Sequence, residues 1–88
     1  MNEIRRLLEE LETAEKKTNE VDAAWDWEKD PDNEELERKW MAAYKVEFDT
    51  HQALVDEIVS VTDGRIDRNI AKRLVGANRE DLKTILSL

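Results

Sequence analysis

His51 is the one histidine of the chain, and Glu47 lies one helical turn before it. An imidazole beside a carboxylate can act as a general base, and it can also supply two ligands of a metal site. The 88 residues hold no cysteine and no second histidine that could complete such a site. We therefore expect a structural role for His51, inside a helical hairpin and opposite Leu11, with no metal and no catalytic residue.

The carboxylates between Asp30 and Glu35 are the next candidates for chemistry. Four of them follow one another closely, as the ligands of a calcium loop do, but Pro31 and the lack of a glycine do not fit the EF-hand pattern. Helix capping explains these acids better, because negative charge is favourable at the first turn of a helix. Gly64 and Gly76 are the only glycines, which excludes a glycine-rich phosphate loop. The sequence indicates neither an enzyme nor a cofactor.

The segment Trp25-Asp26-Trp27 points to binding. Adjacent residues of a helix do not share a face, so Trp27 points elsewhere when Trp25 joins the apolar seam. Two interpretations stay open: Trp27 folds over the end of the hairpin against Met41 or Leu36, or it anchors a partner. Tryptophan is enriched at interface hot spots, and an acidic rim attracts a basic partner. The candidate partner-binding residues are Trp27, Asp26, Glu28, Asp30, Asp32, Glu35 and Met41.

The formal charge of −8 is unevenly distributed along the chain. Residues 1–60 hold 18 acidic and 8 basic residues, whereas residues 61–88 hold 4 and 6. Residues 15–37 alone carry a net charge of −7. This asymmetry concerns partners and solubility, and it predicts that the basic segment docks on the acidic one or forms a solvated face.

Two long apolar stripes, with steps of three and four residues, predict the helices that position these side chains. The first helix is expected over 3–28 and the second over 32–61. Pro31 suits the first turn of the second helix, with Asp30 as its cap. A connection this short makes the two helices antiparallel neighbours.

A turn centred near Pro31 also predicts which residues face each other. Ala14 then lies opposite Phe48, and Thr18 lies opposite Tyr44, so that small side chains meet large ones. Aliphatic residues meet at the open end of the hairpin. Complementary volumes of this kind favour close packing.

Two short helices are expected after Gly64, over 67–75 and 79–87. Asp67 caps the first, Gly76 ends it, and Asn78 is expected to cap the second. Helices of this length are marginal alone, so they should pack on the open end of the hairpin. The predicted fold class is all-α, with one small domain over 1–88: an acidic helical hairpin (1–61) and a basic two-helix cap (62–88).

Three function hypotheses follow from this organisation. The first is a non-enzymatic acidic protein–protein interaction module whose carboxylates imitate DNA phosphates and bind the basic surface of a nucleic-acid-processing protein. In size, charge and lack of cysteine the chain resembles phage-encoded inhibitors of host enzymes. The second is a homodimeric helical bundle, because the first helix has the heptad spacing of a coiled coil. The third is nucleic-acid binding through the basic C-terminal helices, which the acidic net charge disfavours.

The composition also predicts where the protein works. The lack of cysteine fits a reducing cytoplasm, which would be the host cytoplasm for a phage-encoded protein. No apolar run approaches the ~20 residues that a membrane-spanning helix needs. We therefore expect a cytoplasmic protein with no membrane contact.

Overall fold

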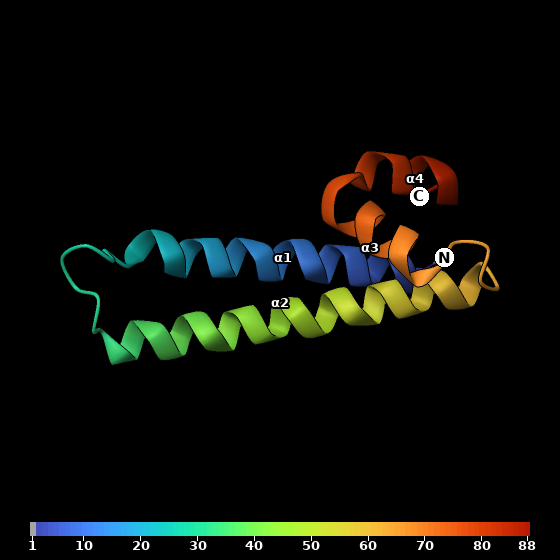
Figure 1. Cartoon of the computed structure of the whole chain (residues 1–88). Helices are drawn as coiled ribbons and strands as arrows, with labels where there is room; N and C mark the ends of the chain where they lie inside the picture. The colour runs from blue at the N-terminus through green and yellow to red at the C-terminus, as the bar shows by residue number, and fades with distance from the viewer. Residues whose placement is uncertain (1) are drawn as a thin grey trace.

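Four helices form the part of the chain that the computed structural model describes, residues 2–88 (Figure 1). They are α1 (Asn2–Ala24), α2 (Glu34–Val61), α3 (Arg68–Ala77) and α4 (Arg79–Leu86). No strand occurs in this range. The two long helices run side by side as an antiparallel hairpin, and α3 and α4 gather at the end that holds the N-terminus (Figure 1). The predicted all-α hairpin with a two-helix cap is confirmed.

The loop between the long helices is wider than the pattern predicted. The first helix ends at Ala24 and not near residue 28, and the second begins at Glu34 and not at residue 32. Asn33 is the N-cap of α2, because its Oδ1 accepts the backbone N–H of Leu36 at 3.0 Å. The expected cap, Asp30, has another role: its Oδ2 accepts the side-chain amide of Asn33 at 2.8 Å. Asn is as good an N-cap as Asp, so the cap lies three residues later and the helix starts two residues later than predicted.

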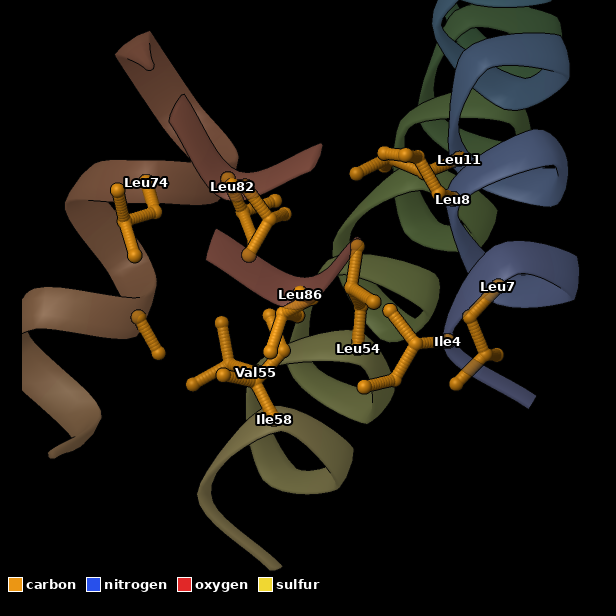
Figure 2. Packing of buried hydrophobic residues seen from close by; sticks show 12 residues of the cluster. Ile4, Leu7, Leu8, Leu11, Leu54, Val55, Ile58, Leu74, Leu82 and Leu86 are labelled. Atoms are coloured by element: carbon orange, nitrogen blue, oxygen red, sulfur yellow. The ribbon is translucent and has the colours of Figure 1, made fainter. Parts of the chain in front are cut away.

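The hydrophobic core lies where the cap meets the open end of the hairpin (Figure 2). Full burial of a leucine or isoleucine side chain contributes about 2 kcal/mol to the free energy of folding. This burial stabilises α3 and α4, which would be only marginally stable as isolated helices. Residues from all four helices contribute fully buried side chains: Ile4 and Leu11 from α1, Leu54, Val55 and Ile58 from α2, Val75 from α3 and Leu82 from α4.

The middle of the hairpin differs from the predicted pairing of large with small side chains. Ala14 and Thr18 are buried, but Tyr44 and Phe48 are 47% and 50% exposed. Ala43 is the buried residue of this part of α2, because it lies about three full turns before Leu54 and shares its face. The helices therefore meet here through small residues, and the aromatic rings lie outside the interface.

The ends of the later helices follow the predicted signals in part. Asp67 caps α3 by accepting a backbone N–H at 2.9 Å, and Gly64 takes a φ of +79° after the end of α2. Gly76 does not end α3, because the helical hydrogen-bond pattern continues past it to Ala77. Asn78 is the N-cap residue of α4 by position, but its side chain makes no capping bond.

Candidate binding surface at the hairpin tip

The tip of the hairpin, residues 25–33, is held in shape by its own side chains. Asp26 Oδ1 accepts the backbone N–H groups of Glu28 and Lys29, each at 3.1 Å. The backbone N–H of Asp30 donates to the carbonyl of Asp26 at 2.8 Å. An aspartate that bonds the N–H groups following it stabilises a turn without regular helix. The loop therefore has a defined conformation although it lies outside the two helices.

The two tryptophans of the tip stack on each other, with ring centroids 3.7 Å apart and planes inclined by 26°. Trp25 is buried, and its indole Nε1 donates to the carbonyl of Asp30 at 2.7 Å. Trp27 is 49% exposed, and its Nε1 donates to the carboxylate of Asp22 at 3.2 Å. Trp27 thus packs on Trp25 while half of its surface stays open to solvent.

Five of the seven predicted partner-binding residues lie together in this loop: Asp26, Trp27, Glu28, Asp30 and Asp32. Glu35 lies in the first turn of α2 and forms an ion pair with Lys39 at 3.2 Å. Met41 lies about two turns further along α2 and is 57% exposed. The geometry groups the loop residues and leaves Met41 apart from them.

Exposed carboxylates surround the tip. Every acidic side chain between residues 20 and 37 is exposed. Within the described range, Glu35 alone among them has a basic side chain within 4.0 Å. Like charges gathered with few counter-charges create a strong local negative potential. The other carboxylates of this group are Glu20, Asp22, Asp26, Glu28, Asp30, Asp32, Glu34 and Glu37.

The basic cap is tied to the hairpin at the opposite end. Arg79 donates from Nη1 and Nη2 to the two carboxylate oxygens of Glu15, at 2.5 and 2.8 Å. This contact raises the pKa of Arg79. Arg68 forms a second ion pair with Asp56. These contacts confirm the predicted docking of the basic segment on the acidic hairpin.

His51 is half-buried on α2, near the ion pair of Arg79 and Glu15. Burial lowers the pKa of His51, and the positive charge of Arg79 acts in the same direction. Glu15 and Glu47 act against this shift, and Lys72 reinforces it. The folded chain therefore favours the neutral imidazole. Among the residues that the structure describes, no three His, Cys, Asp or Glu side chains are placed to hold a metal ion.

A second surface is absent from the sequence predictions. A groove of about 1130 Å³ runs between α1 and α2, and small side chains such as Ala14, Ala42 and Ala43 line it. The sequence feature that could have revealed the groove is the cluster of small residues at positions where the two helices face each other. The predicted pairing hid this signal, because it placed the rings of Tyr44 and Phe48 between the helices.

Comparison of the chain with known protein families, with curated proteins and with solved structures finds no match. None of the helices in residues 2–88 combines the length and the apolar character needed to cross a lipid bilayer.

Proposed function

We propose that the chain is a non-enzymatic protein-binding module that engages a basic partner surface with the acidic tip of its hairpin. The observation that carries the proposal is the group of exposed carboxylates between residues 20 and 37, of which only Glu35 has a basic side chain within 4.0 Å in the described part of the chain. A basic partner would supply the missing counter-charges. Such complementarity speeds association and selects partners of opposite charge.

Two features of the tip support a binding role beyond simple acidity. The internal hydrogen bonds of Asp26 and Asp30 order the loop before any partner arrives, and an ordered loop loses less conformational entropy on binding. Trp27 offers a half-exposed ring in the same loop as Asp26, Glu28, Asp30 and Asp32. A large aromatic side chain inside a charged rim is a common composition of an interface hot spot.

The partner class that fits best is a nucleic-acid-processing protein. Its basic surface is arranged for a row of phosphates, and a row of carboxylates can take their place. On this proposal the module acts as a DNA mimic, in the manner of an inhibitor. The two arginines of the cap that pair with Glu15 and Asp56 are already engaged, which is a further reason to place recognition at the tip and not on the basic helices.

The proposal is tested by capture from a lysate of the source organism on the immobilised chain. We expect a basic protein to be retained at 50 mM NaCl, to elute as the salt concentration rises, and to be displaced by duplex DNA. The triple variant Glu28→Lys, Asp30→Lys, Asp32→Lys should lose this protein.

A matched control changes the net charge by the same amount outside the tip, with Glu12→Lys, Asp49→Lys and Glu80→Lys, three exposed positions. This control should retain the protein almost as well as the native chain, because its tip is intact. An equal loss of capture in both triple variants would mean that the net charge of the chain, and not its tip, determines binding. Capture that is insensitive to the tip substitutions and to salt would refute the proposal.

A further inference from the structure

The groove between α1 and α2 lies on the side of the hairpin away from the cap. No residue of α3 or α4 lines it. Glu15, which binds the cap through Arg79, projects from the opposite side of α1 to Arg6 and Lys17 of the groove. The floor is built from small and apolar side chains, which allow another helix to approach closely: Ala14, Val21, Ala24, Leu36, Ala42, Ala43 and Val46.

Four charged residues on the α1 edge of this groove are placed symmetrically about Thr13: Arg6, Glu9, Lys17 and Glu20. Glu10, the fifth charged residue of this edge, forms an ion pair with Arg6 of the same chain. If a second copy of α1 lies antiparallel with the two Thr13 residues opposite each other, Arg6 faces Glu20 of the other copy. In the same arrangement Glu9 faces Lys17. Each of these four charged residues then meets a residue of opposite charge.

The α2 edge has the same symmetry. Lys39 and Glu57 lie about five turns apart and so project from the same face, and both are symmetric about position 48. Val46 and Thr50, which line the groove, are symmetric about that position too. The loop joins residues 24 and 34, whose numbers add to 58, so side-by-side positions of the two antiparallel helices have numbers adding to about 60. The numbers of Thr13 and position 48 add to 61, so the two positions lie at nearly the same level and one two-fold axis passes close to both.

We infer that this groove face is a self-association surface, on which a second copy of the chain packs to form a four-helix bundle. The copies run in opposite directions, so that the two caps lie outside and the two acidic tips lie at opposite ends. The charges at the groove favour this occupant over a basic protein. Its rim carries three basic and three acidic residues: Arg6, Lys17, Lys39, Glu9, Glu10 and Glu20. A chain of net charge −8 associates with itself most easily where its charges balance.

The size of the face suits a dimer. Two α1 helices paired about Thr13 overlap over residues 2–24, which is about 35 Å. Two helices of about 10 Å diameter lie side by side in this face, so each copy would cover roughly 700 Å², close to the ~800 Å² per partner of a standard interface. The present ion pairs of Arg6, with Glu3 and Glu10, are exposed and easily exchanged.

Light scattering and sedimentation equilibrium of the full chain test the inference. At about 100 µM we expect twice the chain mass of 10.3 kDa. Glu9→Lys alone and Lys17→Glu alone each place like charges at two symmetric contacts, so each should weaken the dimer about tenfold or more. An equimolar mixture of the two single variants should form a heterodimer, because every contact then pairs opposite charges. The double variant should regain self-association for the same reason.

A substitution at the centre of the face gives a second readout. Val46 is 57% exposed in the single chain, so Val46→Asp should leave the helical circular dichroism intact and abolish the dimer. A monomer at 200 µM overturns the inference. A dimer that persists in the Val46→Asp chain also overturns the inference. The same holds if the two single variants, Glu9→Lys and Lys17→Glu, form no heterodimer when they are mixed. The tip variant Glu28→Lys should dimerise like the native chain, which separates this inference from the proposed function.

Discussion

Arg79 and Glu15 form a two-point ion pair between residues 64 positions apart in the sequence, with Nη1···Oε1 and Nη2···Oε2 distances of 2.5 and 2.8 Å. The Arg79 Nε also donates to the carbonyl of Val75 at 2.7 Å. One side chain thus joins the end of α3, the start of α4 and the middle of α1. Its side chain is 24% exposed and that of Glu15 is 32% exposed, so solvent screens the pair less than a surface ion pair.

We predict that Arg79→Met lowers the free energy of unfolding by about 2 kcal/mol, because a charged fork with a defined geometry is lost. Urea denaturation followed by circular dichroism measures the change. The double variant with Glu15→Gln should show a coupling of about 1 kcal/mol between the two positions. Arg73→Met is the matched control, since its side chain is exposed, and it should change stability by less than about 0.5 kcal/mol. If the stability losses of the substitutions at positions 79 and 15 are simply additive, the ion pair makes no direct contribution to the free energy of unfolding.

Substitution of each of the two stacked tryptophans of the tip should show which ring contributes to stability and which to partner binding. Trp27→Ala removes a half-exposed ring, and we expect it to lower the free energy of unfolding by less than about 1 kcal/mol. We expect the same substitution to weaken binding of the captured partner about tenfold or more. Trp25→Ala removes a buried ring and an indole hydrogen bond, and we expect a loss of about 3 kcal/mol. Urea denaturation and partner titration measure both quantities. A Trp27→Ala chain that unfolds easily but binds normally would make this ring part of the fold alone.

The orientation of α2 can be tested with two truncations of similar size. Leu54 is fully buried, so Leu54→Ala should cost about 3 kcal/mol. Phe48 is half exposed, so Phe48→Ala should cost less than about 1 kcal/mol. Thermal and urea denaturation give both values. A larger loss at position 48 would place that ring between the helices, as the sequence pattern had predicted.

His51 should make stability depend on pH. Its lowered pKa means that the folded state favours the neutral imidazole, whereas the unfolded chain takes up a proton below about pH 6.5. This contribution is therefore fully present above pH 6.5, and it is lost as the pH falls towards the folded pKa. Urea midpoints at pH 7.5 and 5.5 should differ more in the native chain than in His51→Gln. Parallel pH profiles of the two chains would contradict the assignment.

The sequence predicted those features that depend on local patterns. Two long helices, their antiparallel pairing and the cap at Asp67 all follow from periodicity and capping chemistry. The start of α2 was misplaced because Asp30 and Asn33 are both good caps, and only the loop geometry decides between them.

The rotation of α2 about its own axis could not be predicted. Tyr44 and Phe48 continue the apolar stripe in the sequence, and small residues such as Ala43 give a weaker hydrophobic signal although they fill the interface. The groove was missed for the same reason. The stacking of Trp27 on Trp25 depends on the path of the loop, which no helical periodicity describes.

The salt dependence of binding tests the central claim, recognition of a basic partner by the acidic tip, most directly. Titration calorimetry of the captured protein would compare the native chain with the Glu28→Lys, Asp30→Lys, Asp32→Lys variant at 50 and 300 mM NaCl. We predict that the native chain binds at least about tenfold more tightly at the lower salt concentration, and that the variant loses both the affinity and most of the salt dependence. Equal affinities of the two chains at both salt concentrations would contradict the claim.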